Sequence, residues 1–436
     1  MSRLIDYLDE LNINSIESLA SYVTASTIDV LLGLVNYARM LVQEDWIEPE
    51  YSPFSFVPSQ ELSGFGGCAG LECRNKRASE FAKFSALYAD SGYIYIPILS
   101  IPHRKEFENN EVVDRLKKSI FSDFSSVIIY SALITKGIVR IVPSNLNICE
   151  NCFIELYSNK DDDQHMRDIV DEYSEKIILT ATSYNPFAHR AVLEVSNLPE
   201  LFTDHNRLIV YTSGIMYDEI RKCKQFPEII GNKKMKREIA VNIIVKEYRN
   251  VKFDAYLSAL YKAKYITQNE STSHMFETTK KKNFQQVQPI LPIYDMPVID
   301  NVDIATILDI RFHEEDAFDT YRVALNKAIH EHRSGQSELE IREVYDDIVY
   351  PEFVKLDNSI TNLKRKHLLR ATGELVILGT TVTLGIISGI VPLTALGVGG
   401  AISLAPTIRK IAENKMEDTE VKNNDYYFLW KLRNSK

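Results

Sequence analysis

The sequence predicts an α/β domain that is followed by an all-helical domain. The first indication is a strand–helix–strand pattern, with β-rich runs at residues 93–98 and 138–142 on either side of a helical pattern at 110–136. Such a unit places its two strands parallel in one sheet. Gly137 is well placed to end the helix before the second strand. We expect this β-α-β unit to belong to a small mixed sheet.

The second indication is a change of pattern near residue 300. Residues 286–300 contain three prolines in an extended apolar stretch, which is typical of a domain boundary. From Val302 onward almost every segment has the periodicity of a helix. We therefore expect an α/β domain at residues 1–285 and a helical domain at residues 286–436.

Local patterns predict the remaining elements. The chain starts with a helical region, in which Ser26 or Thr27 is expected to cap a helix. Residues 49–70 are rich in proline and glycine and are expected to form a loop. Further helices are expected at about 76–90, 161–176, 234–248, 251–266, 302–311, 315–333, 337–349 and 352–372. Further strands are expected at 177–182 and 191–196, as a hairpin, and at 208–212.

Composition and charge exclude several classes of protein. The 436 residues are 45% hydrophobic and 25% charged, which is ordinary for a globular chain and excludes a disordered one. With 50 basic and 60 acidic residues the net charge is −10, so nucleic acid is not expected as a partner, because phosphate binding needs a positive field. The first residues lack the pattern of a secretory signal, so we expect a cytoplasmic protein with reduced cysteines.

Four of the five cysteines form two close pairs. A Cys-x2-Cys pair follows the predicted strand at 138–142, where two thiolates can point at one metal ion. A Cys-x4-Cys pair lies in a glycine-rich loop, and glycines allow the tight turn that such a pair needs. We expect a structural zinc ion, with reduced thiols or a redox pair as alternatives. The predicted ligands are Cys68, Cys73, Cys149 and Cys152.

A glycine-rich apolar segment at 375–408 contains no charged residue. Pro392 divides it into parts shorter than the roughly 20 residues of a membrane span. Two full spans therefore do not fit, and we expect a helical hairpin, with a single span as the alternative. Basic residues flank both ends, which favours both ends staying on the cytoplasmic face if the hairpin enters a bilayer. A hairpin buried in the helical domain fits the same pattern. In general organisation the segment resembles the central hydrophobic hairpin of pore-forming colicins, from which no residue role is carried over.

Carboxylates near the β-α-β unit suggest a different function. Asp90 precedes the predicted strand at 93–98, and Asp114 and Asp123 lie on the helix that follows. Carboxylates gathered at one end of a parallel sheet are the means by which PIN-like nucleases hold Mg²⁺. A metal-dependent nuclease that uses these carboxylates is therefore an alternative function.

The chain lacks the motifs of several large enzyme classes. It has no G-x-G-x-x-G, G-x-x-x-x-G-K-[ST], G-x-S-x-G or H-E-x-x-H sequence, which disfavours dinucleotide enzymes, P-loop ATPases, α/β-hydrolases and zincins. Together with the apolar segment, this favours a non-enzymatic prokaryotic effector or interaction protein, of the kind used in phage defence or toxin systems.

In this interpretation the α/β domain binds a protein partner or a second copy of the chain. The helical domain packs on a partner or enters a membrane through residues 375–408, which places the protein in the cytoplasm or peripheral to the inner membrane. A non-catalytic structural subunit of a larger complex is a further alternative.

Overall fold

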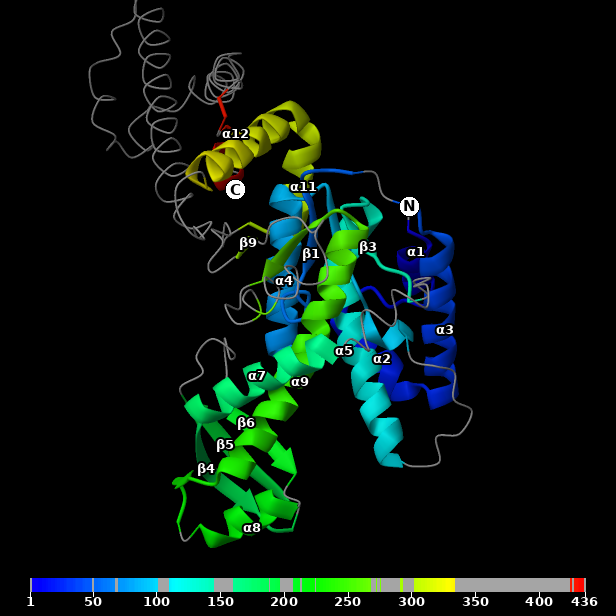
Figure 1. Ribbon diagram of the computed structural model, residues 1–436. Coiled ribbons are helices and arrows are strands. Elements are labelled where there is room, and N and C mark those ends of the chain that lie inside the picture. The colour runs from blue at the N-terminus through cyan, green and yellow to red at the C-terminus, as the bar shows by residue number, and fades with distance from the viewer. Residues whose placement is uncertain are drawn as a thin grey trace, which may run out of the picture. The chain divides into compact units, whose positions relative to one another are not determined.

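The computed structural model describes most of the first 333 residues and a short helix near the C-terminus (Figure 1). The chain divides into two units, Met1–Val298 and Ile299–Lys436, and each is described by itself. The described residues are 2–48, 51–66, 70–100, 110–144, 160–187, 189–196, 207–211, 214–223, 225–267, 272, 275, 291–292, 302–333, 424–425 and 427–434.

One sheet of the first unit is entirely parallel. In sequence order its strands are β1 (Ser55–Pro58), β2 (Ser91–Ile94), β3 (Val139–Ile141), β8 (Lys264–Thr267) and β9 (Leu291–Pro292). In space their order is β3-β2-β1-β8-β9. Strand β2 pairs in parallel with β3, and helix α5 (Asn110–Thr135) connects them, so the predicted β-α-β unit is confirmed. Gly137 follows α5 with φ +73°, a conformation that glycine adopts without strain.

Helices cover both faces of this parallel sheet. Phe56 of β1 contacts Phe84 of α4 (Leu71–Tyr88), with 5.0 Å between the ring centroids. Phe56 is paired with Gly92, so the next residue of β2, Tyr93, points to the other face. There Tyr93 stacks on Tyr261, which directly follows α9 (Lys233–Leu260), at 4.6 Å. Helix α4 therefore covers one face and the end of α9 covers the other.

Three helices precede the parallel sheet. They are α1 (Arg3–Glu10), α2 (Ile16–Ala25) and α3 (Ile28–Glu44). Ser15 and Ser18 form a capping box at the start of α2. Thr27, one of the two predicted caps, accepts a hydrogen bond from the N–H of Val30 at the start of α3. All three helices contact α5, so they extend the layer that it forms.

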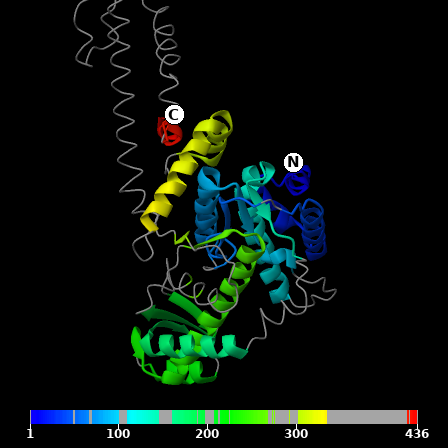
Figure 2. The same cartoon turned by 45° about the horizontal axis from the view of Figure 1, so that its top comes forward.

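The second sheet is antiparallel, so the prediction of one mixed sheet is wrong. Its strands are β4 (Ile178–Asn185), β5 (Arg190–Ser196), β6 (Arg207–Tyr211) and β7 (Glu228–Ile230), in the order β6-β5-β4-β7. The predicted hairpin is confirmed as β4 and β5. Figure 2 shows α7 (Lys160–Lys176) alongside this sheet, and α7 packs on α9. Helix α8 (Gly214–Lys222) completes this part.

Two strands of the parallel sheet lie in segments for which the sequence predicted a loop or a helix. Strand β1 lies inside the stretch expected to be a loop at 49–70, and β8 occupies the end of the helix expected at 251–266. The single helix α9 ends at Leu260, and Lys262 reverses the chain with φ 50°. Both strands have four residues and no exposed position, so they lack the alternation that reveals a strand in a sequence.

The second unit contains two of the predicted helices. They are α11 (Ile304–His313) and α12 (Glu315–Arg333), and α17 (Tyr427–Asn434) packs on both. Phe428 of α17 contacts Phe318 and Tyr321 of α12, with ring centroids at 5.0 and 5.7 Å. The helices expected at 337–349 and 352–372 and the apolar segment at 375–408 lie outside the described residues. Within the described residues, no helix has the length and hydropathy needed to cross a membrane.

Candidate functional site

The strand order of the parallel sheet identifies a candidate binding edge. The chain builds outward from β1 to β2 and β3, and then returns to place β8 on the other side of β1. The connections that follow β1 and β8 therefore leave in opposite directions. In open parallel sheets this reversal opens a crevice at the carboxyl ends of the strands, where ligands bind. We define the switch-point site as the described residues that follow β1 and the side chains packed against them.

The loop after β1 is held in one conformation by its own backbone. The N–H of Ser59 donates to the carbonyl of Ile266 in β8 at 2.8 Å, which continues the β1–β8 pairing into the loop. The carbonyl of Gln60 accepts from the N–H groups of Phe65 at 3.0 Å and Gly66 at 2.7 Å. These bonds close residues 59–66 into a compact loop. Because a folded loop loses little further entropy on binding, such a loop is suited to recognition.

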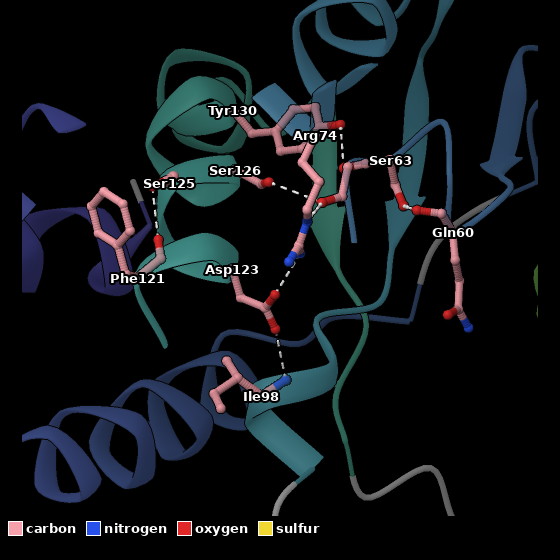
Figure 3. Close-up of polar contacts among 10 residues, drawn as sticks. Gln60, Ser63, Arg74, Ile98, Phe121, Asp123, Ser125, Ser126 and Tyr130 are labelled. Carbon is pink, nitrogen blue, oxygen red and sulfur yellow. Dashed lines mark hydrogen bonds and ion pairs between the residues drawn. The ribbon is translucent and has the colours of Figure 1, made fainter. Parts of the chain in front are cut away.

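Side chains from α4 and α5 fix the far side of this loop (Figure 3). Arg74 donates through Nε to the carbonyl of Gly64 and through Nη2 to Oδ1 of Asp123, both at 2.6 Å. The other oxygen of Asp123 accepts the N–H of Ile98 at 3.0 Å. Tyr130 donates to the carbonyl of Ser63 at 2.9 Å. The loop after β1 and the 3₁₀ helix after β2 (Pro97–Ser100) are thus held by one buried ion pair.

A buried acid lies against the opposite side of the same loop. Asp254 of α9 is 2% exposed and accepts the backbone N–H of Gln60. Its Oδ2 has no hydrogen-bond partner among the described residues. Burial raises the pKa of Asp254 well above its ordinary value, and the charge of Glu247 raises this pKa further, whereas Tyr265 of β8 lowers it. Asp254 is therefore a carboxyl group that holds its proton more tightly than an exposed aspartate does.

Two further carboxylates, Glu247 and Glu61, act together with Asp254 on the buried Tyr265. Glu247 accepts a hydrogen bond from Thr272 at 3.4 Å, and Glu61 belongs to the loop itself. Burial raises the pKa of Tyr265 well above its ordinary value, and Asp254, Glu247 and Glu61 all add to that shift. A strongly shifted acid beside a rigid loop at a switch point is the arrangement expected of a functional site.

Because the pKa of Asp254 is raised, the free energy of unfolding is expected to depend on pH. The Asp254→Asn variant, which has no proton to lose at this position, is expected to lack this dependence. The folded state binds this proton more tightly than the unfolded state, so the stability that the protonated group contributes is complete below the unfolded pKa of about 4. That stability is lost as the pH rises through the folded pKa. We expect the asparagine variant to be more stable than the parent at pH 9, by on the order of 1–3 kcal/mol, with the difference vanishing near pH 4.

Urea unfolding at a series of pH values measures this difference. Asp168→Asn, on the exposed side of α7, is the matched control and is expected to follow the parent profile. If the difference in stability between Asp254→Asn and the parent does not change with pH, the pKa of Asp254 is not raised in the folded protein.

Only one of the four predicted zinc ligands lies within the described residues. Helix α4 begins at Leu71, five residues earlier than predicted, so Cys73 is in its first turn and is half-buried. The other three, Cys68, Cys149 and Cys152, lie outside the described residues. Among the residues that the structure describes, no group of three or more His, Cys, Asp or Glu side chains is arranged to hold a metal ion.

The structure does not bring the predicted carboxylates together. Asp90 precedes β2 and accepts a hydrogen bond from Ser52 at 2.5 Å, so it lies at the amino end of the sheet. Asp123 contacts Ile98 beyond the carboxyl end of β2. Asp114 is exposed near the start of α5. The proposed metal-dependent nuclease therefore has no shared carboxylate cluster in the described part of the chain.

The sequence interpretation did not single out Asp254 or Arg74. Asp254 stands between Phe253 and Ala255 in a long helix, and an acid with apolar neighbours on a helix is a signal of burial. Arg74 follows a glycine-rich loop and carries no signal of its own. Its role depends on Asp123, which lies 49 residues later in the chain.

Fold and site together define the class of this protein. It has a doubly wound parallel α/β fold in which an antiparallel sheet and its helices are inserted between β3 and β8. No protein-family model matches the chain, and neither the curated proteins nor the solved structures contain a significant match to it. The function is therefore inferred from the chemistry of the site and of the sequence.

Proposed function

We propose that this protein is a prokaryotic effector or interaction protein, of the kind that acts in phage defence or toxin systems. Its α/β part recognises a partner at the switch-point site. Its C-terminal part produces the response through the apolar segment at 375–408, by packing on a partner or by entering a membrane. In this proposal the protein acts in the cytoplasm, peripheral to the inner membrane.

Recognition of a partner by the α/β part is supported by one observation, the rigid loop 59–66 beside the buried acid Asp254. Loop and acid lie at the edge where doubly wound sheets bind ligands. Neither belongs to a catalytic motif in the sequence, which supports recognition over catalysis. The ion pair of Arg74 and Asp123 holds the loop from one side, and the Gln60–Asp254 contact holds it from the other.

The proposed response through the C-terminal part is supported by the sequence of the apolar segment at 375–408. Its 34 residues contain no charge, and the flanks are basic on both sides. Basic flanks favour both ends on the cytoplasmic face and are attracted to anionic lipid headgroups. Gly385 and Gly389 form a small-xxx-small pattern, which permits close packing of helices.

Leakage from lipid vesicles tests the membrane role. The intact chain is added to vesicles of phosphatidylethanolamine and phosphatidylglycerol that contain a self-quenched dye. We expect the parent chain to release the dye and Gly385→Asp to release it about a hundredfold less efficiently, because a charge at the bilayer centre costs about 3 kcal/mol.

Gly231→Asp is the matched control for this experiment. Gly231 is exposed in the α/β part, and no atom lies within 4 Å of the position that a Cβ would occupy there. This variant is expected to release dye as the parent does. A parent chain that stays monodisperse, does not sediment with vesicles and releases no dye would contradict the membrane role and leave packing on a partner as the response.

We also propose the structural zinc ion. Cys73 lies at the start of α4, beyond the carboxyl end of β1, and β3 is two strands away, or about 10 Å. Ser144 is the last described residue after β3, and the five residues to Cys149 span at most about 17 Å. The chain between Ser144 and Cys149 is therefore long enough for the second cysteine pair to reach Cys73.

Metal analysis of the purified chain tests the zinc proposal. We expect one zinc ion per chain, lost in Cys73→Ser together with a lower melting temperature, because a structural site stabilises only the folded state. Cys223→Ser is the control and is expected to keep the metal. A parent chain purified without chelator that contains no zinc would refute the proposal.

A further inference from the structure

A cavity lies at the opposite end of the parallel sheet from the switch-point site. Its volume is about 230 Å³, and its wall is formed by the start of α1, the end of α3, the turn after α5 and the edge strand β3. Helix α5 contacts α1, α3 and β3, and α1 contacts α3, next to which it lies in Figure 1. Apolar side chains from each of them line it, among them Leu4, Val42, Ile134 and Val139. Every lining residue belongs to the described part of the first unit.

One cation lines this cavity, the guanidinium of Arg140 in the middle of β3. Its single hydrogen bond among the described residues runs from Nη1 to the carbonyl of Ile47, at the long distance of 3.5 Å. Its Nε is shielded from water and has no acceptor among those residues. Arg140 is only partly buried and its hydrogen bond to Ile47 is exposed to solvent, so a carboxylate that enters the cavity can pair with the guanidinium.

The carboxylate that lines the same cavity is already neutralised. Asp45 accepts from Nε of Arg3 at 2.6 Å and from the backbone N–H of Arg3 at 2.9 Å. Nη1 of Arg3 also bonds Glu44, so this cation pairs with the acids at the end of α3. Arg140 is left as the charged group of the cavity wall that has no carboxylate partner in the described part of the chain.

Size and lining define the ligand that fits. Liquid water occupies about 30 Å³ per molecule, so the cavity has the volume of about eight waters or a ligand of roughly ten non-hydrogen atoms. Mostly apolar walls with one orienting charged group are the usual composition of a small-molecule site. Trp46 also lines the cavity and adds an aromatic side chain to its apolar wall.

We propose that this cavity binds a small organic carboxylate, whose apolar body fills the cavity and whose carboxylate pairs with Arg140. The apolar body is compact, with about the size of one aromatic ring, which matches the volume of the cavity. This site is separate from the switch-point site and does not depend on the proposed effector function.

A charged and a neutral probe of the same shape test this inference. The probes are 4-fluorobenzoate and 4-fluorobenzamide, which differ in charge and have the same number of non-hydrogen atoms. Binding to the full chain at neutral pH is followed by the ¹⁹F linewidth, with a change in tryptophan fluorescence on binding, expected from Trp46, as a second readout. We expect the benzoate to bind at least about tenfold more tightly, since a charge-assisted pair is about twice as strong as a neutral hydrogen bond.

Variants of Arg140 assign this preference to one residue. In Arg140→Gln the two probes are expected to bind equally, and in Arg140→Lys part of the preference remains, because lysine keeps the charge and loses the planar fork. Arg249→Gln, on the exposed surface of α9, is the control and keeps the full preference. Equal binding of the two probes to the parent chain, or no binding of either at millimolar concentration, overturns the inference, and the parent comparison stands even if Arg140→Gln does not fold.

Discussion

Replacing Asp123 by alanine is expected to lower the free energy of unfolding by about 3–5 kcal/mol, because it leaves the guanidinium of Arg74 buried without its carboxylate. The side chains of Arg74 and Asp123 are only 12% and 6% exposed. The N–H of Ile98 loses its acceptor in the same variant. Urea unfolding followed by circular dichroism measures the loss.

Two further variants distinguish the loss of the ion pair from a non-specific loss of stability. Glu172→Ala breaks the exposed pair of Glu172 and Lys176 on α7, whose side chains are 60% and 56% exposed, and is expected to cost less than about 1 kcal/mol. The double variant Arg74→Met with Asp123→Leu removes both charges and is expected to recover most of the stability. A loss below about 1 kcal/mol in Asp123→Ala would show that this pair does not hold the loop.

The Gly64→Ala variant is expected to lose about 2–4 kcal/mol of stability, because strain and overpacking act at the same residue. Gly64 has φ +81°, in the left-handed region that an alanine adopts only with strain. A Cβ at this position would lie 2.8 Å from the Cβ of Ala78 and 2.8 Å from the carbonyl oxygen of Arg74. The loop after β1 would therefore have to move away from α4.

The Gly33→Ala variant of the same chain is expected to change stability in the opposite direction. Gly33 is exposed inside α3, and a Cβ added there would have no atom within 4 Å. This variant is expected to gain about 0.5–1 kcal/mol, because alanine favours the helix. Thermal unfolding of both variants checks the pair of expectations. Equal stability of Gly64→Ala and the parent would mean that the loop is not held in the conformation described.

Elements with a long, periodic pattern were predictable from the sequence. Helices α5 and α12 each form within a few residues of the predicted range, because repeated apolar positions over many turns specify a helix. The hairpin of β4 and β5 was also predictable. Alternate residues of β5 are buried, and a turn with Asn185 and Pro186 separates the two strands.

The two central strands of the parallel sheet were not predictable in this way. Strands β1 and β8 pair with each other, and each has four residues without an exposed position. A buried parallel strand shows no alternation, so its sequence resembles a segment of loop or of helix. The switch point between them, and with it the candidate site, could therefore not be located from the sequence.

The roles of the site residues depend on contacts with residues that are far away in the sequence. Asp123 appeared in the sequence as one of three carboxylates for a metal, and the fold pairs it with Arg74 instead. Asp254 had no predicted role, and the fold buries it against the backbone of Gln60. Neither pairing leaves a trace in local sequence, because charge pairing across a core depends on the distance between elements and not on their periodicity.

The sequence by itself determined the α/β class of the first part of this protein, the β-α-β unit, the hairpin and the cap of α3, since each depends on local periodicity or on a side chain next to its own backbone. The tertiary structure alone decided that there are two sheets, that β1 and β8 meet at a switch point, that Asp254 is buried, and that Arg140 lines a cavity. Those features arise from contacts between segments that are distant in sequence, and the free energy of such contacts depends on burial and geometry that no local pattern encodes.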